Sequence, residues 1–145
     1  SRLTKSPKLY FIDTGLACRL QGWTSSTPIL TSPQQGHLFE NLVFSELYKL
    51  NINYQLGLRI FHWRSRDGEE IDFLIEYGRE KYVFIESKVS ATKAKNIGIL
   101  PEVKKVFGNS IPENIVCHEE GDRIFNGNVP IALLKNFLLK KLTSR

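Results

Sequence analysis

Two carboxylates and an amine fall within one short apolar part of the chain, residues 69–89. Asp72 lies in its first half, and Glu86 and Lys88 lie two residues apart in its second half. Both halves are rich in Ile, Val, Phe and Tyr, so we expect two strands joined by a turn. Two carboxylates held side by side in such a hairpin repel each other, and one stays protonated unless a cation neutralises the pair. This acid, acid and amine set is the main functional clue in the sequence.

The turn of the hairpin decides whether the two acids meet. A three-residue loop at 78–80 is a common hairpin length, and it would pair Tyr77 with Lys81. Counting back along both strands then places Asp72 opposite Glu86, on one face and roughly 5 Å apart at Cβ. A slip of one residue in this register would put the two acids on opposite faces.

A strong helical pattern over residues 37–50 supplies a third carboxylate. Phe39, Val43 and Leu47 recur at helical spacing and form the predicted buried stripe. Glu40 falls inside this apolar arc, where a carboxylate is unfavourable without a partner. Glu40 therefore either joins the acids of the hairpin or sits at the edge of the stripe, paired with a surface Lys or Arg.

The remaining patterns place these residues in one mixed domain. We expect a helix that Asp13 or Thr14 caps and that stops at Gly22. After it we expect a loop over 24–35, a strand over 58–64, helical pieces over 91–108 and a strand over 114–118. A final helix capped by Asn128 ends the chain, and another short strand is an option at 123–125. This order predicts an α+β or mixed α/β sandwich. Residues 1–35 would form a leading strand, helix and loop, and residues 36–145 would form the core of a single globular domain.

Composition limits the class of protein. No apolar run approaches the roughly 20 residues of a membrane span, and the first residues do not resemble a signal peptide. Cys18 and Cys117 lie far apart and in no C-x-x-C pair, which favours the cytoplasm and argues against a disulfide scaffold or a zinc site. The net charge of +5 modestly favours an anionic partner.

The acids and the lysine resemble the pattern of the PD-(D/E)xK nuclease superfamily. Asp72 takes the place of the acid on the second core strand, Glu86 and Lys88 frame the E-x-K of the third, and Glu40 takes the place of a glutamate on the first helix. The resemblance implies a restriction-endonuclease-like core, a central mixed sheet flanked by helices in the order α-β-β-β-α-β-α.

A second resemblance covers about residues 8–142. It rests on four stretches: KLYFIDTGL at 8–16, GHLFENLVFSEL at 36–47, GEEIDF at 68–73 and IESK at 85–88. They are similar to the C-terminal domain of a large group of prokaryotic AAA-type ATPases, a domain with no assigned function that follows an ATPase module. This likeness implies that the ATPase part is missing here. The sequence contains no G-x-x-x-x-G-K-S/T phosphate loop, so we expect no ATP binding.

The side chains would suit metal-assisted phosphodiester hydrolysis. Mg²⁺ or Mn²⁺ held by carboxylates can screen the phosphate, activate water and stabilise the leaving oxygen. Asp72 and Glu86 would be direct ligands, with the backbone carbonyl of Ser87 as a third candidate. Glu40 would bind a second ion or a metal-bound water, and Lys88 would orient the attacking water or stabilise charge on the phosphate.

The sequence is compatible with two functions. The first is a metal-dependent nuclease acting on DNA, with Arg64 and Arg66 as contacts to the nucleic-acid backbone. The second is a catalytically silent module that binds nucleic acid or docks a partner for its ATPase. A structural interpretation stands beside both, because a buried ion pair of Lys88 with Glu86 or Asp72 would satisfy the same side chains. The three histidines lack ligand spacing, and Tyr10 is expected to serve in packing.

Overall fold

The fold is built on one five-stranded sheet with helices on both faces. The computed structural model describes residues 7–65 and 67–143. Within these residues the helices are α1 (Thr14–Leu20), α2 (Ser26–Leu30), α3 (Gln35–Asn53), α4 (Pro101–Phe107) and α5 (Ile131–Thr143), with a 3-10 turn η1 (Ile97–Ile99). The strands are β1 (Arg59–Arg64), β2 (Glu70–Gly78), β3 (Lys81–Ser87), β4 (Glu113–His118) and β5 (Asn128–Pro130).

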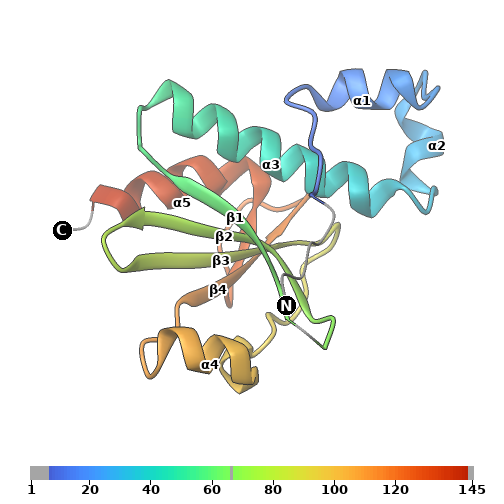
Figure 1. Cartoon of the computed structure of the whole chain (residues 1–145). Helices are drawn as coiled ribbons and strands as arrows, with labels where there is room; N and C mark the ends of the chain where they lie inside the picture. The colour runs from blue at the N-terminus through green and yellow to red at the C-terminus, as the bar shows by residue number, and fades with distance from the viewer. Residues whose placement is uncertain (1–6, 66, 144–145) are drawn as a thin grey trace.

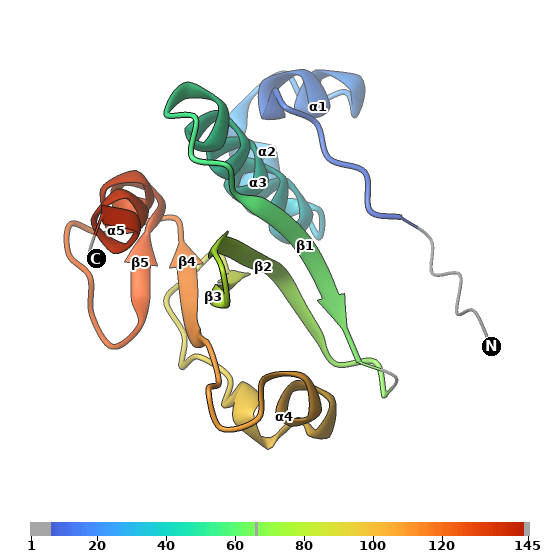
Figure 2. The same cartoon turned by 60° about the vertical axis from the view of Figure 1, so that its left-hand side comes forward.

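The sheet is open and mixed, with its strands in chain order from β1 to β5. The first three strands are antiparallel, whereas β3, β4 and β5 run parallel. Helices α3 and α5 cover one face and α4 lies against the other, while α1 and α2 sit beside the start of α3 (Figures 1 and 2). The prediction of a mixed α+β domain is therefore confirmed at this level.

Apolar side chains from both faces of the sheet build two cores. The larger core joins α3 and α5 to the sheet, and Val43, Leu47, Ile75 and Ile85 are fully buried in it. The smaller core lies under α4, where Ile71, Phe84 and Ile97 are buried against partly buried aromatic rings. Because side chains alternate along a strand, membership in these two cores shows which face each strand residue occupies.

The hairpin of β2 and β3 has the predicted register but not the predicted turn. Gly78 pairs with Lys81, which leaves a two-residue turn, and the register shifts between Glu76 and Gly78. The shift offsets the shorter turn, so that the pairs from Glu76 back to Phe73 follow the predicted alignment.

A second irregularity separates the two acids. Phe61 pairs with Leu74 and Trp63 with Ile71, so two β2 residues lie opposite one β1 residue. This β-bulge lets Asp72 and Phe73 face the α3 side together, with Asp72 lining a cavity against α3. Glu86 follows Ile85, a residue of the α3-side core, and so points to the α4 side. The prediction that Asp72 and Glu86 share a face is wrong, because one inserted residue reverses the alternation.

Outside the hairpin, the ends of the chain differ most from expectation. Asp13 caps α1 through its side chain, as predicted, but residues 7–13 form no strand. The predicted loop at 24–35 contains α2. Asn128 begins a three-residue strand parallel to β4, and the final helix starts only at Ile131. Across the described residues, no helix is long and apolar enough to cross a membrane.

Candidate functional site

The segment before α1 lies across α3 and brings its own side chains to the acids. The Asn41 side chain accepts from the Phe11 N–H at 2.7 Å and donates to the Phe11 carbonyl at 2.9 Å. The Ser45 hydroxyl donates to the carbonyl of Ile12 at 2.5 Å. Because residues 7–13 form no helix or strand, these side-chain bonds fix their backbone in place of a ladder. They position Lys8 and Tyr10 over the edge of the sheet.

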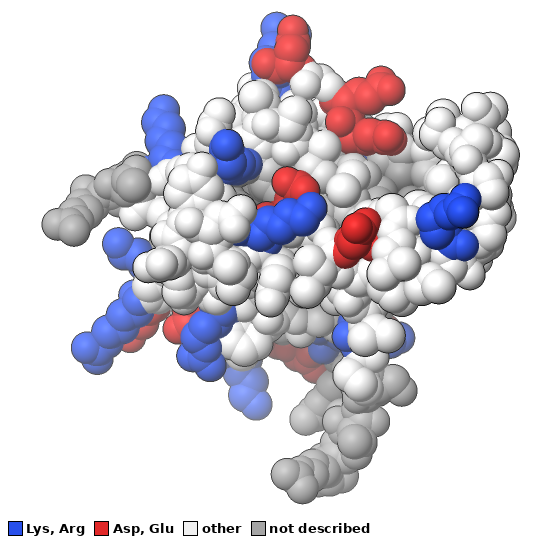
Figure 3. Space-filling model, turned by 90° about the horizontal axis from the view of Figure 1, so that it is seen from above, with Lys and Arg blue, Asp and Glu red and all other residues white. Residues whose placement is uncertain are grey.

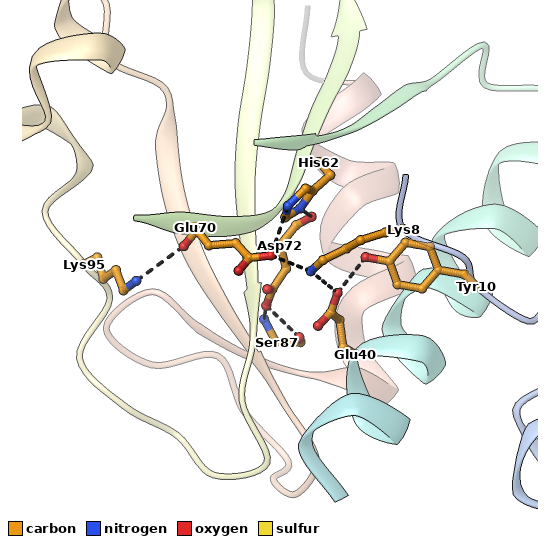
Figure 4. Close-up of polar contacts among 8 residues, drawn as sticks. All are labelled: Lys8, Tyr10, Glu40, His62, Glu70, Asp72, Ser87 and Lys95. Atoms are coloured by element: carbon orange, nitrogen blue, oxygen red, sulfur yellow. Dashed lines mark hydrogen bonds and ion pairs between the residues drawn. The ribbon is translucent and has the colours of Figure 1, made fainter. Parts of the chain in front are cut away.

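Two of the predicted site residues meet there. Asp72 and Glu40 line one cavity of about 490 Å³, together with Lys8, Tyr10 and Glu70. Figure 4 shows these side chains converging from β2, α3 and the N-terminal segment. We call Glu40, Glu70 and Asp72, with the groups that bond to them, the acidic cluster.

One ammonium group joins two of the three acids. The Nζ atom of Lys8 lies 2.8 Å from Oε1 of Glu40 and 2.8 Å from Oε1 of Glu70 (Figure 4). Burial alone would lower the pKa of Lys8, but its bonds to Glu40 and Glu70 outweigh burial and raise that pKa above 10.5. Lys8 is thus a fixed cation at the centre of the acidic cluster.

Tyr10 gives Glu40 a second donor. Its hydroxyl donates to Oε1 of Glu40 at 2.6 Å, and its ring stacks on Phe44 at 4.4 Å between centroids. Burial, followed by the bond to the Glu40 carboxylate, raises the pKa of Tyr10 above its ordinary value of 10. The predicted packing role is confirmed, and the hydroxyl adds a polar one. The partially desolvated Glu40 is satisfied by Lys8 and Tyr10, both from the N-terminal segment.

His62 contacts Glu70, the third acid of the cluster. Its Nε2 lies 3.0 Å from Oε1 of Glu70, and its Nδ1 lies 3.3 Å from the backbone oxygen of Asp72. The bond from Lys8 lowers the pKa of Glu70 below 4.5, and the charges of Lys8, His62 and Arg64 act in the same direction. Glu70 therefore stays ionised to a lower pH than an ordinary glutamate does.

The Asp72 carboxylate is hydrogen-bonded to the neighbouring strand, β3. Its Oδ2 accepts from both the backbone N–H and the hydroxyl of Ser87, each at 2.7 Å. Ser87 is the middle residue of the Glu86-Ser87-Lys88 motif, so the motif does touch Asp72, but through its central residue.

The two outer residues of the motif lie elsewhere. Glu86 is buried on the α4 side, where its Oε1 accepts from Nδ2 of Asn114 at 2.8 Å. Lys88 is exposed, and it has no ion-pair partner among the residues that the structure describes. The structural interpretation that pairs Lys88 with Glu86 or Asp72 is therefore not what the fold adopts.

This arrangement does not fit the metal that the resemblance implies. Within residues 7–65 and 67–143, no three Asp, Glu, His or Cys side chains are grouped so that they could hold a metal ion. Glu40 and Glu70 already share an ammonium, Asp72 already accepts two hydrogen bonds, and Glu86 faces away. A Mg²⁺ ion needs several free oxygen ligands arranged around one point.

Of the two arginines predicted to contact nucleic acid, the structure describes one. Arg64 is exposed at the end of β1, close enough to Glu70 to influence its pKa. Arg66 lies outside the described residues.

Sequence reasoning missed Lys8, His62 and Glu70 as members of the cluster. A signal was present for one of them, because Lys8 and Tyr10 are two residues apart in an extended stretch and can point the same way. No pattern in the sequence links that stretch to Glu40, about thirty residues later.

Comparison with known proteins gives relatives without an assigned activity. Over 83 residues the chain is 31% identical to the uncharacterized proteins Mb2031c of Mycobacterium bovis and Rv2008c of Mycobacterium tuberculosis. The aligned part is 57% of this chain but only 18% of each relative, so the chain matches less than a fifth of their length. No solved structure matches the chain. A family model matches residues 35–134, from the start of α3 into α5, and the chain belongs to that family, described as a domain of unknown function, DUF4143.

Proposed function

We propose that this chain is the C-terminal accessory domain of a prokaryotic AAA-type ATPase, with a restriction-endonuclease-like core. In this proposal it binds nucleic acid for the ATPase and does not cleave it by itself. Apart from the 3-10 turn η1 and the short strand β5, the order α3, β1, β2, β3, α4, β4, α5 is the one that the nuclease resemblance implies, and it supports the core. The greater length of the mycobacterial relatives leaves room for an ATPase module in proteins of this kind.

One observation carries the choice of a silent domain over an enzyme. The Lys8 ammonium lies between Glu40 and Glu70 at 2.8 Å from each, in a position where a metalloenzyme would need free carboxylate oxygens. Because the Lys8 ammonium neutralises their charge, the acids stay ionised and ordered without a metal. The acidic cluster then serves to fix the N-terminal segment to the sheet.

The charge of the domain supports a nucleic-acid partner. Lys and Arg exceed Asp and Glu by 20 to 15, and six of the acidic side chains form ion pairs with described Lys, Arg or His side chains. Surplus cations release counterions when they bind phosphates, so affinity should fall steeply with salt.

The test is binding and cleavage measured on one preparation. Fluorescence anisotropy of labelled DNA should show salt-dependent affinity in the wild type and in Asp72→Asn, and neither should cut DNA with Mg²⁺ or Mn²⁺. Absence of affinity for DNA at low salt would contradict the proposed nucleic-acid binding and would leave docking to a protein partner.

A magnesium- or manganese-dependent nuclease is the second candidate. It is favoured by the meeting of Asp72 and Glu40 at one cavity and by the hydrogen bond that Ser87 of the Glu86-Ser87-Lys88 motif donates to Asp72. It would require Lys8 to leave the acids. Plasmid and single-stranded DNA should then be cut by the wild type and by neither Asp72→Ala nor Lys88→Ala, whereas equal cutting by all three would indicate a contaminant.

A further inference from the structure

A separate groove lies at the opposite end of the hairpin from the acidic cluster. It has a volume of about 830 Å³ and is bordered by the β2–β3 turn, the start of β4, Ile124 between β4 and β5, and one side of α5. Tyr77 lines this groove and Asp72 lines the acidic cavity. The two residues are five positions apart on β2, which corresponds to about 16 Å along a strand. The two sites are therefore distinct, and we call this one the α5 groove.

The α5 groove carries an excess of positive charge. Lys81, Lys140 and Lys141 line it together with a single acid, Glu113. Lys141 forms an ion pair with Glu113, and Lys81 is exposed with no ion-pair partner among the described residues. Figure 3 shows Lys and Arg side chains gathered on the left, at the end of the molecule toward which α5 runs. An anionic ligand is therefore favoured over a neutral or cationic one.

Flat rings face the same space. Tyr77 and Phe137 line the groove with Ile124, which is about half exposed, and Asn136 adds an amide that can donate and accept. The Lys141 ammonium lies 5.7 Å from the centre of the Phe137 ring, so charge and ring are presented together. Lysines beside aromatic rings are the combination that binds the phosphates and the unstacked bases of a single strand.

We propose that the α5 groove binds single-stranded nucleic acid, with the lysines on the phosphates and Tyr77 and Phe137 against the bases. Bases in a duplex are stacked on one another and cannot cover these rings, so the single strand is the better match. An acidic peptide would satisfy the lysines but would leave the rings without a planar partner. The inference rests on the proposed nucleic-acid binding and assigns that binding to named residues.

The experiment is anisotropy of a fluorescein-labelled oligothymidylate of about 12 nucleotides, within the ~4–16 nucleotides that such modules cover. Lys81→Gln should weaken binding and reduce the slope of log affinity against log salt by about 0.7, the value for one phosphate contact on a single strand. Phe137→Leu keeps the side chain apolar but removes the ring, and it should weaken binding about 5-fold or more without changing the slope. Lys104→Gln, an exposed lysine of α4 on the other face, is the matched control and should change neither quantity.

The outcomes separate this inference from the proposed function. If the wild type binds and both groove variants behave like Lys104→Gln with native circular dichroism, the groove is the wrong site, although nucleic-acid binding stands. A duplex that binds as tightly as the single strand, or polyglutamate that competes equally well, would also overturn the groove assignment. Failure of the wild type to bind any oligonucleotide at low salt would overturn both proposals.

Discussion

Lys8 is the residue on which the acidic cluster depends. Only 14% of the Glu40 side chain is exposed, so removing the ammonium leaves a largely desolvated carboxylate with Tyr10 as its remaining donor. We expect Lys8→Met to lower the free energy of unfolding by about 1–3 kcal/mol, the usual cost of leaving a buried polar group without its partner. Urea denaturation followed by circular dichroism measures this change.

The matched control lies on α3. Lys49 pairs with Glu46, but both side chains are about half exposed, so Lys49→Met should cost less than about 0.5 kcal/mol. Combining Lys8→Met with Glu40→Gln should restore part of the loss, since the uncompensated charge is then gone. Equal effects of the Lys8 and Lys49 substitutions would show that Lys8 is only a surface ion pair.

Stability should depend on pH in two ranges set by this cluster. Glu70 has a lowered pKa when folded, so its contribution is present above pH 4.5 and is lost as pH falls through the folded value. Lys8 and Tyr10 have raised pKa values when folded, so their contributions are present below about pH 10 and are lost as pH rises further.

Each range has a variant that tests it. Glu70→Gln should flatten the decline of unfolding free energy in acid, and Tyr10→Phe should flatten the decline in alkali. A profile whose two arms stay as steep as those of the wild type would place the responsible groups elsewhere.

The role of a single residue is predictable from the sequence only where its partners lie close to it along the chain. Glu40 was recognised as misplaced because its neighbours on the same helix define the apolar arc. Its partners, Lys8 and Tyr10, are 32 and 30 residues away and share no periodic pattern with it. The side of the sheet predicted for Asp72 is wrong, because a local count of residues cannot reveal the extra β2 residue opposite β1.

At the scale of elements, the N-terminal segment is held to α3 by side chains in place of a strand ladder. Asn41 makes bonds to the Phe11 N–H, the Phe11 carbonyl and the Thr14 hydroxyl. Asn41→Ala should therefore cost about 2 kcal/mol, since each lost bond is worth about 0.5–1.5 kcal/mol.

Hydrogen exchange distinguishes a local effect from a global one. The Phe11 amide should exchange much faster in Asn41→Ala, while core amides of β3 change only as far as global stability does. Asn53→Ala, at the exposed end of the same helix, should leave the Phe11 amide protected. Unchanged protection of Phe11 in Asn41→Ala would mean that packing of Tyr10 alone holds the segment.

The elements themselves were predictable where their signals are local. Each of these signals depends on residues only a few positions apart: the apolar stripe of α3, the strand-forming side chains of β2 and β3, and the Asp13 cap of α1. The sequence predicts a helix cap at Asn128 where the structure has the strand β5, because three residues carry too little pattern and their partner, β4, lies across a loop. The register of the hairpin was obtained only because a shorter turn and an unforeseen shift cancel.

At the scale of the whole molecule, α3, α5 and the sheet share one core, so the domain should unfold as a unit. Cys117 is fully buried in that core, and burial raises its pKa to about 12, whereas Cys18 is half-buried. Native protein at neutral pH should therefore react with a thiol reagent at one cysteine, Cys18. Cys117 should react only at urea concentrations where circular dichroism reports unfolding. Labelling of Cys117 at lower urea would reveal separate opening of β4.

The β-bulge that contains Asp72 and Phe73 also affects how copies of this domain meet. β1 forms one edge of the sheet, and an edge strand offers unpaired backbone groups to any strand of another molecule. The shift between Phe61 and Trp63 twists this edge, and exposed arginines stand at both of its ends, Arg59 and Arg64. The irregularity that turns Asp72 toward α3 thus makes β1 a poor template for edge-to-edge aggregation.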